Sequence, residues 1–299
     1  MFYIFAIYVD KADENFTIKD MRTSFYSIAN RSGIVCASNQ DHTLYSLSKE
    51  EPLAVAVDPK APIPWDGIID GYKRLGEPEY HSEFSDYAKD FERYLSSQSH
   101  LSGINLGEGT KIIFFGYGTE DIFPRIYSAD VKQNDEGVLE FCNECYEKIS
   151  VNNKISLCHI GEFESIETLL YGTTHSADMC ILENHTKMYN AFVERVLDKF
   201  KGTKYEAALK EQIAAFDKQA MMQECINTVA HRQYRHAVIG IDSFGIEDMV
   251  DAVETLVDAN ANLDHLRSGC KEPLTSTREL AVVTRIEGLT WIKHSLFTF

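Results

Sequence analysis

The sequence contains one pair of cysteines with the spacing of a metal or redox site. Cys142 and Cys145 are separated by two residues, and Cys158 and His159 follow them. Thiolate and imidazole groups are preferred ligands of Zn²⁺, but a structural site needs four ligands, which usually come from two such pairs. A second pair is missing from the sequence, and Cys158 lies in an apolar run typical of a strand. We therefore expect isolated thiols, no metal ion and no cofactor.

Three other motifs fail on their spacing or their context. The glycines and the lysine of segment 103–111 run into a strand, whereas a phosphate-binding loop opens a helix. Segment 240–245 resembles a nucleophile elbow but has one residue too many before Ser243, so we expect Ser243 to cap the following helix. His231 and His236 are five residues apart, a spacing that does not stack two ligands on one helical face. These motifs therefore predict no active site.

The composition argues against several classes of protein. The chain has 299 residues and a formal net charge of -17, from 46 acidic and 29 basic side chains. Such acidity argues against binding to nucleic acid or an anionic membrane surface, because phosphate groups attract clustered Lys and Arg. No apolar run approaches the ~18 residues of a membrane span, and the run 1–9 lacks the basic start and cleavage site of a signal peptide. Seven scattered cysteines suit reduced thiols, so we expect a cytoplasmic protein.

Short apolar runs dominate the first fifth of the chain. The run 2–9 predicts one strand, and the runs 23–28, 34–37, 43–47 and 53–57 predict four more, separated by turn residues. Strands joined by short turns are typical of an antiparallel meander.

The rest of the chain alternates between helical groups and strands. Apolar residues at three- and four-residue spacing predict helices over 65–75, 84–95, 187–200, 204–230 and 246–266. Strands are expected over 111–115, 124–131, 155–160, 280–285 and 289–294, the last two as a hairpin. Helices segregated from antiparallel sheets indicate an α+β fold. We expect a single domain over 1–299, with a helical hairpin at 187–230 inserted in it.

The order of several segments resembles the proteasome-like branch of the N-terminal nucleophile hydrolases. The segments 23–39, 112–118, 124–130, 246–266 and 281–292 resemble the family's first hairpin, central strand and glycine turn, next strand, last long helix and closing hairpin. The resemblance implies a four-layer αββα sandwich, in which two stacked antiparallel sheets lie between helical layers. The helical hairpin is then added length.

The resemblance also assigns candidate catalytic residues. Active members of the family use the first residue of the mature chain, whose hydroxyl is the nucleophile and whose α-amine, with an ordinary pKa of ~8, is the base. Thr23 falls at the nucleophile position, and Asn39 falls where the family has an aspartate. Asp264 and Ser268 resemble the supporting pair near the end of the last helix. These four residues are catalytic candidates only if the chain is cut before Thr23.

Several departures from the family pattern argue that this site is impaired. Asn39 carries no charge, and the family's lysine position falls near Thr43, whereas Lys49 lies too far along the hairpin. Segment 161–163 places a bulky acid where the family has a small turn, and Cys270 interrupts a glycine pair. Without a lysine, nothing assists removal of the proton from the nucleophile.

Three hypotheses about function follow. The first is an assembly or scaffold subunit without activity of its own, which self-associates or joins related subunits as the family does. The second is a threonine-type peptidase or amidohydrolase, matured by removal of residues 1–22. The third is a small-molecule binding domain on the same fold, with the helical hairpin as a lid.

Overall fold

The computed structural model divides the chain into two compact units. One unit comprises residues 1–163 together with 241–299, and the other comprises 164–240. The structure describes residues 24–48, 52–75, 84–98, 109–161, 175–216, 240–268 and 277–294, with a few isolated positions between them. The strand expected over 2–9 lies outside the described residues.

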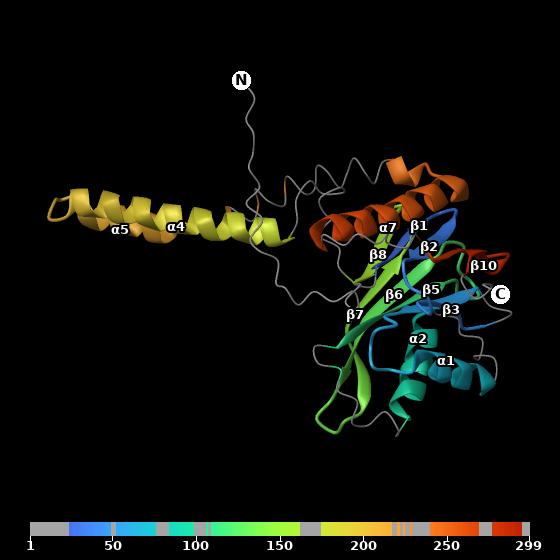
Figure 1. Cartoon of the computed structure of the whole chain (residues 1–299). Coiled ribbons are helices and arrows are strands. Elements are labelled where there is room, and N and C mark those ends of the chain that lie inside the picture. The colour runs from blue at the N-terminus through green and yellow to red at the C-terminus, as the bar shows by residue number, and fades with distance from the viewer. Residues whose placement is uncertain are drawn as a thin grey trace. The chain divides into compact units, whose positions relative to one another are not determined.

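The larger unit contains two antiparallel sheets of five strands each (Figure 1). Sheet A has the order β10-β9-β2-β1-β8, and sheet B has the order β3-β4-β5-β6-β7. The strands of sheet A are β1 (Ser24–Asn30), β2 (Gly33–Ser38), β8 (Ser156–Gly161), β9 (Glu279–Thr284) and β10 (Gly288–Lys293). The strands of sheet B are β3 (Leu44–Ser46), β4 (Leu53–Val57), β5 (Thr110–Gly116), β6 (Arg125–Gln133) and β7 (Leu139–Lys148).

Two apolar layers hold these sheets in a sandwich. Between the sheets, Phe25 of β1 and Phe115 of β5 stack with their ring centroids 5.9 Å apart, among buried aliphatic residues of both sheets. On the outer face of sheet B, α1 (Trp65–Arg74) and α2 (Phe84–Ser96) bury their apolar stripes. On the other side, α7 (Ile246–Ser268) contacts β1, β2 and β9 of sheet A (Figure 1). The expected α+β sandwich of two stacked antiparallel sheets is confirmed.

The expected meander is wrong. β1 and β2 pair with each other in sheet A, but β3 and β4 pair in sheet B, and β2 pairs with β9 instead of β3. Every residue of β2 is buried, because α7 covers one face of the strand and sheet B covers the other. Burial on both faces removes the alternation that would show which strands share a sheet. The chain therefore crosses from one sheet to the other at 39–43, where the sequence predicted only a turn.

Strand β7 is not predicted by the sequence. It lies at the edge of sheet B, and only Leu139 and Phe141 of the strand are buried. An irregular register between Ser128 and Asp130 of β6 and a positive φ of 51° at Asn143 mark a bulge in this pair of strands. An edge strand that is mostly polar and bulged has too little apolar alternation to be recognised.

The smaller unit contains an antiparallel helical hairpin. α4 (His175–Phe200) and α5 (Glu206–Ala215) are joined by a short turn, in which Gly202 has a φ of +75°. We expected helices over 187–200 and 204–230. α4 begins earlier and α5 ends at Ala215, but the described positions Ala220, Met221, Glu224 and Thr228 are again helical. Phe216 leaves the helical conformation with a ψ of 109°, and its ring stacks on Tyr189 at 5.7 Å. The single domain with an insertion at 187–230 stays a prediction.

No helix in the described part of the chain has both the length and the apolar character needed to cross a membrane.

Candidate functional site

The structure describes only part of the predicted catalytic set. Thr23 lies outside the described residues. Asn39 follows the last residue of β2 and is buried, at the end of the sheet where Phe25 of β1 pairs with Ser38. Asp264 and Ser268 belong to the last turns of α7, but their side chains lie outside the described residues. The set therefore stays a prediction.

The crossover loop 38–44 is closed by its own hydrogen bonds. Ser38 donates its hydroxyl proton to Thr43 Oγ1 at 2.9 Å, and Thr43 donates to the Gln40 carbonyl at 3.3 Å. The backbone N–H of Gln40 donates to Ser38 Oγ at 3.1 Å. Thr43, which occupies the position expected for the lysine, is fully buried and uses its hydroxyl to stabilise the loop. A neutral, hydrogen-bonded hydroxyl does not replace an ammonium group.

Glu279, the first residue of β9, anchors this loop. Its role was not predicted from the sequence. Its carboxylate accepts the backbone N–H groups of His42, Thr43 and Leu44 at 2.9, 3.1 and 3.0 Å. Burial raises the pKa of Glu279 to about 7, against the opposing effect of these donors. Next to it, Arg278 donates to Asp41 at 2.7 Å. The signal in the sequence was weak: a single acid in front of the apolar run 280–283.

The cysteine pair lies on strand β7, away from this loop in the sheet order. Cys142 and Cys145 are free thiols, as is Cys158 of β8. Burial raises the pKa of the Cys158 thiol to about 12 and lowers the pKa of His159 to about 4. Among the residues that the structure describes, no group of three or more His, Cys, Asp and Glu side chains is arranged to hold a metal ion.

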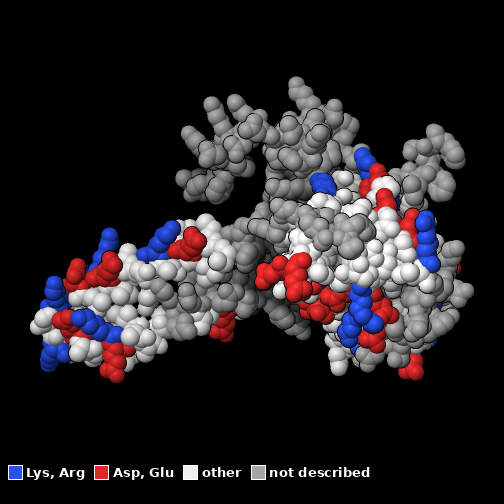
Figure 2. All heavy atoms as spheres, turned by 90° about the horizontal axis from the view of Figure 1, so that it is seen from below, with Lys and Arg blue, Asp and Glu red and all other residues white. Residues whose placement is uncertain are grey.

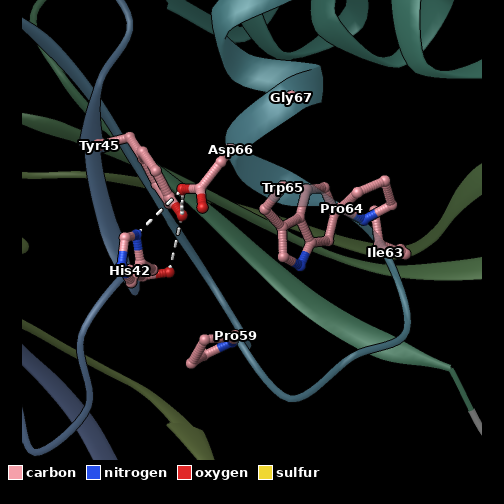
Figure 3. A pocket seen from close by; sticks show the side chains of 8 residues that line it. All are labelled: His42, Tyr45, Pro59, Ile63, Pro64, Trp65, Asp66 and Gly67. Carbon is pink, nitrogen blue, oxygen red and sulfur yellow. Dashed lines mark hydrogen bonds and ion pairs between the residues drawn. The ribbon is translucent and has the colours of Figure 1, made fainter.

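A pocket opens between the crossover loop and the start of α1 (Figure 3). Its volume is about 180 Å³. At about 30 Å³ of liquid volume per molecule, this is room for about six waters, and it is below the ~300 Å³ at which typical ligand pockets begin. The pocket therefore suits a group about the size of one amino-acid side chain. The lining residues are His42, Tyr45, Pro59, Ile63, Pro64, Trp65, Asp66 and Gly67.

The polar side of this pocket converges on one carboxylate oxygen. Tyr45 donates its hydroxyl proton to Asp66 Oδ1 at 2.7 Å, and the same hydroxyl is 3.0 Å from the His42 carbonyl. His42 Nδ1 lies 3.1 Å from the same Asp66 oxygen (Figure 3). Burial, and then the hydrogen bond to Asp66, raises the pKa of Tyr45 above its ordinary range, so the hydroxyl keeps its proton. Among the described residues, Asp66 Oδ2 accepts no hydrogen bond and is available to a ligand.

The crossover loop positions His42 in this pocket. His42 has a φ of +59°, a conformation that costs a residue with a side chain about 1 kcal/mol. Its backbone N–H donates to Glu279, which fixes the turn. On the opposite wall, Trp65 donates its ring N–H to the Asp58 carbonyl at 3.0 Å. In the sequence, the signal of this wall is the apolar run from Ile63 to Trp65.

The helical hairpin carries the second candidate surface. Leu182, Val193 and Leu197 of α4 are half-buried, whereas Met188 and Phe192 are 69% and 66% exposed. The apolar residues of α4 are therefore divided into a half-buried set and an exposed set. Charged side chains of both signs surround uncharged surface on this unit (Figure 2). None of the described residues from 178 to 216 is buried.

No protein-family model and no curated protein matches this chain.

Proposed function

We propose that this chain is a non-catalytic assembly subunit of the proteasome-like branch of the N-terminal nucleophile hydrolases. Two stacked five-stranded antiparallel sheets with helices outside them support the family assignment. The segment order quoted above for the first hairpin, the glycine turn and the last helix supports it as well. On this proposal the sandwich is inherited from a hydrolase and now carries an interaction surface.

The chemistry of the crossover loop supports the loss of catalysis. Asn39 supplies an amide in place of a carboxylate, and Thr43 supplies a hydroxyl in place of an ammonium group. Glu279 then places an acid against the loop where the family has its positive charge. Neither form of this acid lowers the pKa of a nearby nucleophile or amine, because the protonated form carries no positive charge and the carboxylate favours their protonated forms.

The helical hairpin is the observation on which the assembly function depends. None of the described side chains from 178 to 216 is buried, and a ring contact between Tyr189 and Phe216 joins α4 to the end of α5. Isolated helices gain most of their stability from packing an apolar face, and a pair of helices has no core of its own. We infer that another surface covers this hairpin in the functional state.

Two measurements test this proposal together. Sedimentation velocity of the full chain over a hundredfold range of concentration, from about 1 to about 100 μM, is expected to show a species larger than the monomer. Fluorogenic peptides and a threonine-directed covalent inhibitor are expected to show no turnover and no adduct. A strict monomer would contradict the assembly function. Turnover that disappears in Thr23→Ala would favour the alternative hydrolase.

A second candidate function, binding of a small organic cation, is favoured by the pocket beside α1. Asp66 Oδ2 offers one free carboxylate oxygen, and Trp65, Ile63 and the two prolines of the lining form an apolar wall for a short hydrocarbon stem. The net charge of -17 favours cations over anions. A guanidinium or ammonium group with a stem of a few carbons fits this combination.

The test of this candidate compares a cation with a neutral analogue. The probe is n-butylguanidinium, the neutral analogue is n-butylurea, and binding is followed by NMR shifts of the full chain. Asp66→Asn is expected to weaken binding of the cation about 10-fold or more, since it removes a charged hydrogen bond. Asp70→Asn, one turn further along α1, removes the same charge outside the pocket lining and serves as the control. Equal binding of both probes, or equal loss in both variants, would contradict the candidate.

A further inference from the structure

The uncovered face of α4 forms a narrow stripe along the helix. Ile181, Met188 and Phe192 are separated by seven and four residues, so they lie within about 40° of one another around the axis. Their side chains are 47%, 69% and 66% exposed. We call these three residues the α4 stripe. Side chains at this spacing form the seam of paired helices.

The charges at the two ends of the stripe are opposite. Continuing the same helical spacing, Asp178 lies at the first end, and Arg195 and Lys199 lie at the second. The segment 175–216 as a whole contains six acidic and six basic residues and is neutral, in a chain with a net charge of -17. Two copies of this segment therefore meet without the mutual repulsion expected between the acidic sandwiches.

We propose that the α4 stripe pairs with the α4 stripe of a second copy of this chain, with the two helices antiparallel; this rests on the assembly function proposed above. Antiparallel pairing brings Asp178 of each copy to Lys199 of the other, and Met188 next to the second Met188. Parallel pairing would place Arg195 and Lys199 beside their own copies, which like-charge repulsion disfavours. The contact has two-fold symmetry and closes on itself as a dimer.

The length of α4 is sufficient for such a seam. The helix has 26 residues, which at ~1.5 Å per residue gives about 39 Å. The stripe occupies its central part, and the charged residues flank it on both sides. This arrangement of an apolar centre and a charged rim is the ordinary anatomy of a protein interface.

The experiment measures the dimer dissociation constant of the full chain by sedimentation velocity. Phe192→Glu is expected to raise this constant about 100-fold or more, because an aromatic anchor is lost in both copies. Ile286→Glu is the matched control: it places the same charge at a residue that is 95% exposed on the β9–β10 turn and is expected to leave the constant within about twofold. Circular dichroism of each variant checks that the helices remain.

Charge reversal tests the antiparallel orientation. Asp178→Lys alone and Lys199→Asp alone are each expected to raise the dissociation constant about 10-fold, since a two-fold interface contains each pair twice. The double variant is expected to recover at least half of that loss on a logarithmic scale, because each copy again meets the opposite sign.

The outcomes separate the inference from the proposed function. If Phe192→Glu leaves the dissociation constant of the assembly unchanged, the α4 pairing is wrong while the assembly function stands. Dimers that the double reversal fails to restore would overturn the antiparallel orientation. A monomer at every concentration would overturn both the inference and the proposed function.

Discussion

The ionisation of Glu279 makes stability depend on pH in a definite direction. Its side chain is 2% exposed, and burial raises its pKa from the ordinary 4.5 to about 7. The folded protein therefore holds this proton more tightly than the unfolded chain. The resulting stabilisation is complete below pH 4.5 and is lost as the pH rises through 7. At 1.36 kcal/mol per unit, a window of about 2.5 units corresponds to about 3 kcal/mol.

The perturbation that isolates this effect is Glu279→Gln. Glutamine keeps one oxygen for the backbone donors of the crossover loop. Because its side chain is neutral at every pH, the variant has no ionisable group at this position. The free energy of unfolding of the wild type, minus that of the variant, is expected to fall by about 2.5 kcal/mol between about pH 5 and about pH 8. Urea unfolding followed by the fluorescence of Trp65 and Trp291 measures it. Glu287→Gln removes the same charge from an exposed turn and controls for net charge.

Parallel pH profiles of the wild type and Glu279→Gln would refute this reasoning. A wild type that gains stability over the variant as the pH rises would mean that the three backbone donors outweigh burial and hold the pKa of Glu279 below its ordinary value. In that case the crossover loop would hold Glu279 as a carboxylate, and Glu279 would stay negatively charged throughout the physiological pH range.

Three further substitutions test the packing. Gly116→Ala should destabilise the protein by about 3 kcal/mol or more, since the new Cβ would lie 1.9 Å from the Pro52 carbonyl oxygen. A fully stable variant would contradict this close approach of Gly116 to Pro52. Gly67→Ala, with no atom within 4 Å of the new Cβ, should stabilise α1 by about 0.5–1 kcal/mol, and a loss of stability would contradict the open space there. Phe115→Ala should cost about 3–5 kcal/mol from its fully buried position between the sheets, against less than about 0.5 kcal/mol for Ile286→Ala. Urea unfolding measures all three, and similar costs for Phe115→Ala and Ile286→Ala would contradict the sandwich.

The sequence predicted the parts of the fold whose pattern is local. The stripe of α2, the β3–β4 hairpin and the β9–β10 hairpin follow from residue spacing and turn residues, and the structure confirms them. The assignment of strands to sheets depends on long-range pairing, which the fully buried β2 does not reveal. The polar edge strand β7 has no apolar pattern to detect. The end of α5 at Ala215 coincides with the stacking of Phe216 on Tyr189, a contact that residue spacing does not reveal.

The sites were harder to predict than the fold, because their residues are distant in the sequence. Glu279 meets the loop at His42 only because β9 pairs with β2, and the sequence separation of these residues is 237. The pocket likewise joins the crossover loop to the start of α1 through Asp66. The exposure of the α4 stripe was also hidden, because its apolar spacing equals that of a helix packed in a core.

Native mass spectrometry of the protein purified from its own cells tests the central claim most directly. It reads the mass of the subunit and the number of subunits in one experiment. The account predicts assemblies whose mass is a multiple of the full chain of 34.0 kDa, with residues 1–22 retained and Thr23 internal. A monomer, or a subunit shortened to begin at Thr23, would contradict it.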